Sequence, residues 1–219
     1  MMSSYRRIAQ LKTADEFRAY QKKLGIDLPF DEHMESGPAA SLAQPYQLRD
    51  GFLIGNRFCI QPMEGWDGTV DGKPSDLTRR RWKRMGQSGA KLIWGGEAVS
   101  ISPEGRDNKN QLIISEENLS ALKELREGVV EVHETLYGSS SDLLVGIQIV
   151  HSGRFSVKPV ILYHHPYLEE KRGLPPDYPL LSDEEIQDVI DEYVDAVELS
   201  AAAGFDFVDV KHCHGYLGH

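Results

Sequence analysis

The densest group of side chains that could do chemistry lies at the end of the sequence. A lysine, three histidines and a tyrosine fall within the last nine residues: Lys211, His212, His214, Tyr216 and His219. Ordinary pKa values extend from about 6.5 for imidazole to about 10 for phenol, so these groups can hold charge and donate protons. A tyrosine is a suitable acid for protonating a carbanion or enolate. The segment is therefore the first candidate for catalysis, and a surface loop with incidental histidines is the alternative.

The same segment also allows a metal site. Because His212 and His214 alternate, both imidazoles would lie on one face of an extended chain, as they do in zinc hydrolases. Glu64 and Glu97 are the acidic residues at other strand ends that could complete such a site. A metal-dependent hydrolase that uses His212 and His214 is therefore kept as an alternative.

A second group of candidates lies between Gln148 and Arg154. Alternation along a strand directs Gln148 and Val150 to one face and Ile149 to the other. The Gln148 amide can donate to and accept from a heteroaromatic ring, and Gly153 permits close approach of the backbone. The alternative for Gln148 is a buried amide that neighbouring strands satisfy.

Two shorter segments could line a flat ligand. Gly95 and Gly96 remove side chains where such a ligand would press on the backbone, although a tight turn explains them equally well. Pro62 and Met63 could form a platform for the ligand, or an ordinary exit from a strand.

These candidates all follow short apolar runs that predict strands, at residues 57–61, 91–94, 143–150 and 205–210. Helical periodicity predicts helices over 76–87, beyond the candidate N-cap Ser115, and from the capping box of Ser182 and Glu185 to Gly204. Strands that alternate with helices indicate a parallel sheet, either a doubly wound open sheet or a TIM barrel. Both folds place their sites at the carboxyl ends of the strands. The missing Gly-x-Gly-x-x-Gly motif weakens the dinucleotide-binding option.

Composition narrows the class of protein. The 219 residues carry 34 acidic and 24 basic side chains, for a formal charge of −10, which argues against a nucleic-acid or membrane-surface binder. The two cysteines suit a reducing cytoplasm, and no apolar run approaches the roughly 18 residues of a membrane span. Residues 1–50 are predicted to form an N-terminal arm with a helix over 14–24, and residues 51–219 an α/β domain.

Four segments together resemble the old yellow enzyme family of flavin oxidoreductases. They keep the family's order and spacing, and the resemblance covers about residues 50–219, closest to the bacterial branch with trimethylamine dehydrogenase and dienoyl-CoA reductases. The segments are residues 56–63 (NRFCIQPM), 96–99 (GEAV) with Gly105 and Arg106, 148–154 (QIVHSGR) and 214–217 (HGYL).

The resemblance implies an eight-stranded barrel that carries FMN at its C-terminal mouth. Gln61, Pro62 and Met63 would lie along the flavin, Gly96 near the polar edge of its ring, and Gln148 would bond the pyrimidine part. The implied substrate-binding pair is Lys211 and His214, with Tyr216 as proton donor. Two residues depart from the family pattern. Lys211 replaces a usual His or Tyr, and Glu64 stands where some members place Cys or Thr near the flavin carbonyl.

A complete barrel takes about 250 residues, so four predicted strands indicate a truncated N-terminal half, about four β/α units, of a TIM (β/α)8 barrel. The later strands would supply an arginine at the flavin and the phosphate-binding loops. The expected activity is that of an FMN-dependent NAD(P)H oxidoreductase, in which NADH or NADPH reduces FMN and an activated alkene is then reduced. Alternatives are an amine dehydrogenase and a non-catalytic half-barrel. Homo-oligomers or pairing with a missing C-terminal half would cover the open edges.

Overall fold

The computed structural model describes residues 5–219. The chain divides into two compact units, and the boundary in the sequence falls between Ser41 and Leu42. The first unit contains a 3-10 turn, Ile8–Gln10, and helix α1, Ala14–Leu24. Thr13 caps α1 by accepting a hydrogen bond from the backbone of Glu16, and Gly25 ends it in the left-handed conformation. The helix predicted over residues 14–24 is confirmed.

The second unit contains a small hairpin and the parallel strands that carry the candidate residues. The 3-10 turn Ser41–Ala43 crosses the boundary, and the hairpin pairs β1, Tyr46–Gln47, with β2, Leu53–Ile54. Two three-stranded parallel sheets follow. Their orders are β3-β4-β6 and β5-β7-β8, with bounds Cys59–Ile60, Leu92–Ile93, Leu144–Val145, Ala98–Ser100, Ile147–Val150 and Val208–Val210.

The two sheets follow one another along the same stretches of chain. Strands β4 and β5 are separated by a bend at Gly95 and Gly96, and β6 and β7 adjoin at Gly146. As a result, β3 pairs with β4, the first of the two strands in the β4–β5 segment. In contrast, β8 pairs with β7, the second of the two strands in the β6–β7 segment. Neighbouring strands are thus stepped relative to one another, as in a sheet that curves into a barrel.

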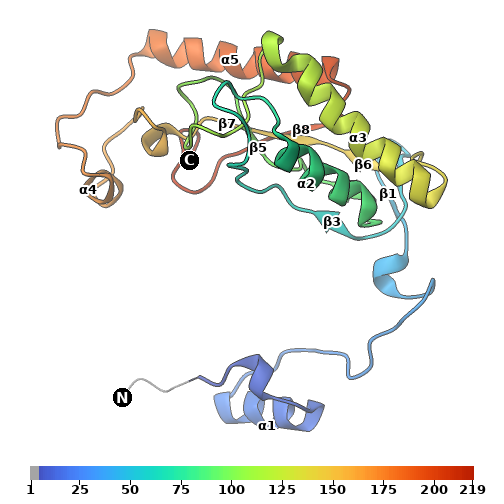
Figure 1. Ribbon diagram of the computed structural model, residues 1–219. Coiled ribbons are helices and arrows are strands. Elements are labelled where there is room, and N and C mark those ends of the chain that lie inside the picture. Colours follow the sequence, from blue (N-terminus) through green and yellow to red (C-terminus); the bar gives the residue numbers. More distant parts are fainter. Residues whose placement is uncertain (1–4) are drawn as a thin grey trace. The chain divides into compact units, whose positions relative to one another are not determined.

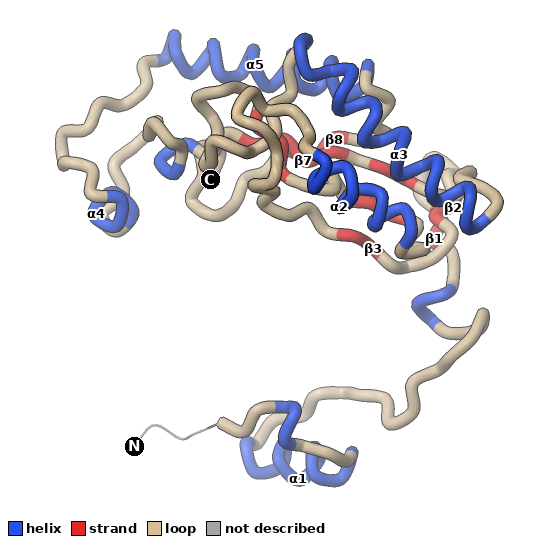
Figure 2. Tube along the Cα trace, in the orientation of Figure 1, coloured by secondary structure: helices blue, strands red, loops and turns tan. Residues whose placement is uncertain are grey.

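Helices follow the strands as predicted. Helix α2, Asp76–Gln87, begins at the capping box of Ser75, and α5, Asp183–Ala202, begins at the predicted capping box of Ser182 and Glu185. Ser115 makes no capping bond, because a 3-10 turn, Glu116–Asn118, separates it from α3, Leu119–Tyr137. A 3-10 turn, Gly153–Phe155, precedes the loop predicted over 155–181, and that loop contains a short helix, α4, Leu168–Arg172, which the sequence did not suggest (Figure 2).

Helices α2, α3 and α5 cover one face of the sheets (Figure 1), and the main core lies between these helices and the sheets. Ile149 belongs to this core, whereas Val150 faces the other way and joins Ala98 and Tyr216 in a smaller cluster. The alternation predicted for this strand is therefore confirmed. The inner cluster places Tyr216 on the face opposite the helices. None of the helices that the structure describes combines the length and apolar character needed to cross a bilayer.

Core packing predicts which substitutions destabilise the fold. Leu122 on α3 is 0% exposed within the core, whereas Leu136 on the same helix is 55% exposed. Leu122→Ala is expected to lower the free energy of unfolding by about 2–5 kcal/mol because it leaves a cavity. Leu136→Ala should change it by less than about 0.5 kcal/mol. Urea unfolding monitored by circular dichroism measures both, and equal losses would contradict this assignment of the core.

Candidate functional site

The chain after β8 turns back sharply and brings its functional side chains together. His214 has a φ of 61°, a left-handed value that non-glycine residues seldom adopt, and Gly215 follows with a φ of 71°. This turn places the Nζ of Lys211 4.6 Å from the centre of the Tyr216 ring. Both Lys211 and Tyr216 are buried, whereas the imidazole of His214 is largely exposed.

Glu64, in the segment that follows β3, connects these residues. Its carboxylate accepts from the Nζ of Lys211 in an ion pair, and its Oε2 lies 2.7 Å from the Tyr216 hydroxyl. The Nδ1 of His214 lies 3.6 Å from Oε1 of Glu64. The structure therefore brings together all three residues expected to be catalytic, Lys211, His214 and Tyr216, around a carboxylate expected to lie beside the cofactor.

Asp107 is a further member of the site, and sequence reasoning missed it. It lies in the loop after β5, and its Oδ2 is 3.0 Å from the Tyr216 hydroxyl. The indole Nε1 of Trp66 donates to Oδ1 of Asp107 over 3.1 Å. A lone aspartate in a polar loop has no distinguishing pattern, and only the folded chain shows it facing the strand-end residues.

The two carboxyl groups have opposite pKa shifts. Burial works to raise the pKa of Glu64, but hydrogen bonds with Asp107, Lys211 and Tyr216 outweigh it and lower that pKa to about 2. Burial, together with the neighbouring Glu64, raises the pKa of Asp107 to about 6. Burial and the two carboxyl groups also raise the pKa of the Tyr216 phenol. Between about pH 2 and pH 6, the negative charge of the pair therefore belongs to Glu64, and above about pH 6 Asp107 is ionised as well.

The residues expected along a cofactor ring lie at the ends of neighbouring strands. Gln61 and Met63 are exposed, and Pro62 is half-buried. The Nε2 of Gln148 donates to Oδ2 of Asp209 over 2.6 Å, and its carbonyl oxygen accepts no bond from residues 5–219. An amide oxygen without a partner among these residues is the kind of group that could bond the polar edge of an isoalloxazine.

Gly96 has a structural reason to be glycine. It has a φ of 56°, and a Cβ at this position would lie 2.6 Å from the Trp82 ring. Glu97 next to it is buried on the same side, where it accepts from Nε1 of Trp82 over 2.9 Å and pairs with Arg81. Burial raises the pKa of Glu97 despite this pairing. The packing of the Trp82 ring is thus sufficient to require glycine at this position.

The remaining candidates support the loops. The guanidinium of Arg154 is buried, forms an ion pair with Glu169 and donates to the carbonyl of Gly215, so it braces the turn that carries Tyr216. His212 is bonded through Nδ1 to the carbonyl of Gly218 at 2.7 Å. Among residues 5–219, no three or more His, Cys, Asp or Glu side chains are placed to hold a metal ion. The hydrolase alternative therefore finds no ligand set around His212 and His214.

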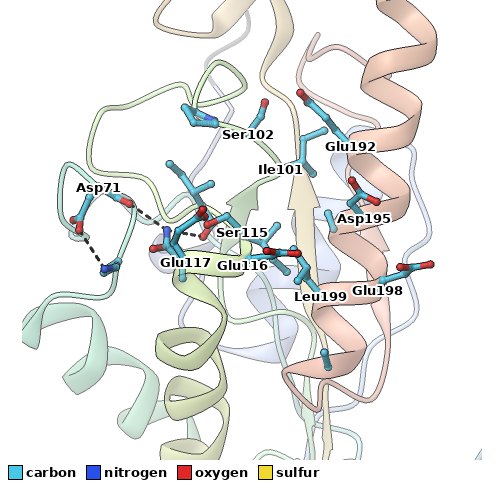
Figure 3. Close-up of a pocket in the computed structure, with 17 residues that line it drawn as sticks. Asp71, Ile101, Ser102, Ser115, Glu116, Glu117, Glu192, Asp195, Glu198 and Leu199 are labelled. Carbon is cyan, nitrogen blue, oxygen red and sulfur yellow. Dashed lines mark hydrogen bonds and ion pairs between the residues drawn. The ribbon is translucent and has the colours of Figure 1, made fainter.

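A cavity of about 940 Å³ lies elsewhere, between α5 and the turn at the start of α3 (Figure 3). Figure 3 shows Glu192, Asp195 and Glu198 along α5, with Glu116 and Glu117 on the facing turn. Its lining includes none of the residues that the sequence singled out for chemistry. The candidate active site is therefore not this cavity but the strand-end cluster, which consists of Glu64, Asp107, Lys211, His214 and Tyr216.

The parallel strands place this cluster at their carboxyl ends, as in an α/β barrel, and comparison with known proteins gives the family. Residues 41–219 match the model of the NADH:flavin oxidoreductase / NADH oxidase family. The chain belongs to this family, whose old yellow enzyme members use FMN with NADH or NADPH as reductant. The resemblance seen in the sequence is thereby confirmed, together with an oxidoreductase family that uses FMN and NADH or NADPH.

Individual relatives agree with this assignment. The NADPH dehydrogenases of Bacillus velezensis and Geobacillus sp. (strain WCH70) are 28% and 29% identical over 187 and 182 residues, which cover 83% and 80% of this chain. These matches cover 51% and 49% of the relatives, so the chain spans about half their length.

Solved structures show the same partial coverage. The old yellow enzyme homologue from Zymomonas mobilis (26% identity) and a morphinone reductase variant in complex with tetrahydroNAD (25%) both match with a TM-score of 0.61. Each match covers 81% of this chain and 50% of the other. The second unit is thus a partial α/β barrel.

The ion pair with Lys211 predicts how Glu64 titrates. Lys211→Met is expected to raise the pKa of Glu64 from about 2 towards its ordinary value near 4.5, because the buried carboxylate loses its cation. Because the pKa of Glu64 is lowered in the folded state, its ionised form contributes to the free energy of unfolding above about pH 4.5. This contribution is lost as the pH falls towards 2. The loss of stability in the variant should therefore be larger at pH 7 than at pH 3.

Carbon-13 NMR of the carboxyl groups measures this titration, and urea unfolding measures the stability. Lys158→Met, at an exposed lysine, is the control and should leave both unchanged. An unaltered Glu64 titration in Lys211→Met would refute the ion pair.

Proposed function

We propose that this chain is the N-terminal part of an FMN-dependent NAD(P)H oxidoreductase that reduces an activated alkene. The observation that supports the proposal best is the convergence of Lys211, His214 and Tyr216 from one strand end with Glu64 from another. An alkene conjugated to an oxygen substituent needs an electrophile at that oxygen and an acid at carbon. The cluster contains both kinds of group.

Each residue has a distinct part in this proposal. The exposed imidazole of His214 donates to the substrate oxygen and polarises the alkene. Lys211 has three N–H donors, so a donor is left for the same oxygen while another holds Glu64. Tyr216 gives its hydroxyl proton to the α-carbon.

The cofactor ring would be held by Gln61, Pro62, Met63, Gly96 and Gln148. When bound, FMN supplies the hydride that adds to the β-carbon, and NADH or NADPH restores it. Glu64 would lie beside the ring as well, so its ion pair with Lys211 would offset the charge that it brings to the reduced cofactor. The basic groups for the phosphate would come from later strands of the barrel.

Amine oxidation is the second candidate, and the carboxyl pair favours it. Asp107 accepts a hydrogen bond from the exposed indole of Trp66, and Asp107 and Glu64 both contact the Tyr216 hydroxyl. Carboxylates near an aromatic ring attract a cationic amine. Reduction of the bound flavin by an amine, without NAD(P)H, would support this direction of the reaction.

The role of Tyr216 can be tested in the FMN-loaded protein. Tyr216→Phe is expected to slow reduction of an activated alkene such as 2-cyclohexenone by about 10²–10⁴-fold, because the acid is lost. Reduction of the flavin by NADPH should change little. Stopped-flow absorbance separates the two half-reactions, and Tyr167→Phe, at an exposed tyrosine, is the control. Equal losses in both half-reactions would contradict this role. A protein that binds no flavin even when it is paired with the remaining strands of the barrel would support the non-catalytic alternative.

We also infer that a second half-barrel covers the open side of this one. In the described residues β8 pairs only with β7, and α5 exposes Ile190, Val194 and Val197 beside it. An apolar groove of about 580 Å³ lies between α5 and the chain after β8. Since the relatives are about twice as long, the remaining β/α units are the occupant that fits this surface.

Ile190→Asp combined with Val194→Asp is expected to weaken that pairing by more than tenfold, because it charges an apolar contact. Titration calorimetry of the chain with a polypeptide that supplies the remaining strands and helices measures the affinity. Gln187→Asp, exposed on the same helix, is the control. A homodimer that excludes this polypeptide would show that a second copy is the occupant instead.

A further inference from the structure

The Tyr216 hydroxyl is flanked by two carboxyl groups. Oε2 of Glu64 lies 2.7 Å from the phenolic oxygen and Oδ2 of Asp107 lies 3.0 Å from it. A phenol has one proton to donate and an oxygen that can accept. The two contacts are both satisfied only when Tyr216 donates to one carboxylate and accepts from the other carboxyl group in its protonated form.

The charges around the pair decide which carboxyl group holds the proton. Glu64 faces two basic groups, the Nζ of Lys211 in an ion pair and the Nδ1 of His214 at 3.6 Å. Asp107 faces the Tyr216 hydroxyl, the indole N–H of Trp66 and Glu64 itself, and none of these three groups is a cation. The Trp66 bond goes to Oδ1, so Oδ2 is left to carry the proton. Of the two arrangements that satisfy both contacts of the Tyr216 hydroxyl, the charges favour Asp107–O–H to Tyr216–O–H to Glu64.

This order matters when Tyr216 acts as an acid. A phenolate left beside the charged Glu64 would be strongly disfavoured, and burial together with both carboxyl groups already raises the pKa of the phenol. On its own, Tyr216 is thus a poor proton donor. A proton that arrives from Asp107 as the phenolic proton leaves would prevent that charge from forming.

We propose that Asp107 is the proton source behind Tyr216, and that Glu64, held by Lys211, keeps this proton on Asp107. The inference rests on the proposed alkene reduction, in which Tyr216 protonates the substrate. The Tyr216 O–H bond breaks as the α-carbon–hydrogen bond forms. The Asp107 O–H bond breaks as a new Tyr216 O–H bond forms. Asp107 is half-buried, so its carboxylate then takes a proton from water. No other reactant is consumed in the relay.

Asp107 acts through Tyr216, so its test needs a pH profile as well as a rate. In the FMN-loaded protein, the single-turnover reduction of 2-cyclohexenone is expected to fall as the pH rises through about 6, where Asp107 loses its proton. Asp107→Asn should remove this fall and be slower than the parent by about tenfold or more at low pH. Asp107→Glu should restore part of the profile, and Asp177→Asn, at an exposed aspartate, should leave it unchanged.

A second readout needs no cofactor and no variant that could fail to fold. Carbon-13 NMR of the flavin-free chain should show an aspartate carboxyl group that titrates near 6. An Asp107 that titrates near its ordinary value of 3.8 would overturn the relay, as would an Asp107→Asn variant with the parent's pH profile. The proposed function fails separately, when Tyr216→Phe leaves alkene reduction unchanged. Slow reduction in Tyr216→Phe with an unchanged Asp107→Asn profile refutes the relay alone.

Discussion

The contact of Glu64 with Lys211 and Tyr216 is the interaction on which the site depends. It joins the chain after the first parallel strand to the chain after the last one, across a sequence separation of 147 residues for Lys211. Parallel strands alone would bring these ends to one edge without fixing any side chain. The ion pair orients the buried ammonium, and the hydroxyl contact orients the phenol. The left-handed turn at His214 is supported by Arg154, which donates to the carbonyl of Gly215.

The same contact explains why Glu64 and Asp107, whose ordinary pKa values are similar, have different pKa values in this cluster. Glu64 receives a cation and several hydrogen bonds, whereas Asp107 receives neutral donors and the field of Glu64. Pairs of titratable groups whose surroundings separate their pKa values are a common basis of acid–base chemistry in enzymes. In this chain the two pKa values are separated because Glu64 meets Lys211 at the strand ends, whereas Asp107 lies in a loop and contacts neutral donors.

Much of the fold could be predicted from the sequence, because helix capping and strand alternation depend on residues that are close together in the chain. The Ser182 capping box and the alternation of Ile149 and Val150 state which way residues face, and the structure has both as predicted. The site was only partly predictable. Lys211, His214 and Tyr216 stand together in the sequence, whereas Asp107 reaches them only through tertiary structure. The Gly96 position shows the reverse, since a glycine that suggested a ligand is already required by the Trp82 ring.

The charge balance of the cluster follows from these contacts and bears on any ligand placed there. Between about pH 2 and pH 6 the charges of Lys211 and Glu64 cancel and Asp107 is neutral, so the group formed by these three residues carries no net charge. Above about pH 6 the loss of one proton gives the group one negative charge in a partly buried position. A family member with Cys or Thr at the place of Glu64 would lack the carboxylate that raises the pKa of Asp107. The replacement of that residue by Glu64 thus couples an acid on a loop to the tyrosine at the barrel mouth, and Lys211 is the cation that makes this arrangement electrostatically tolerable.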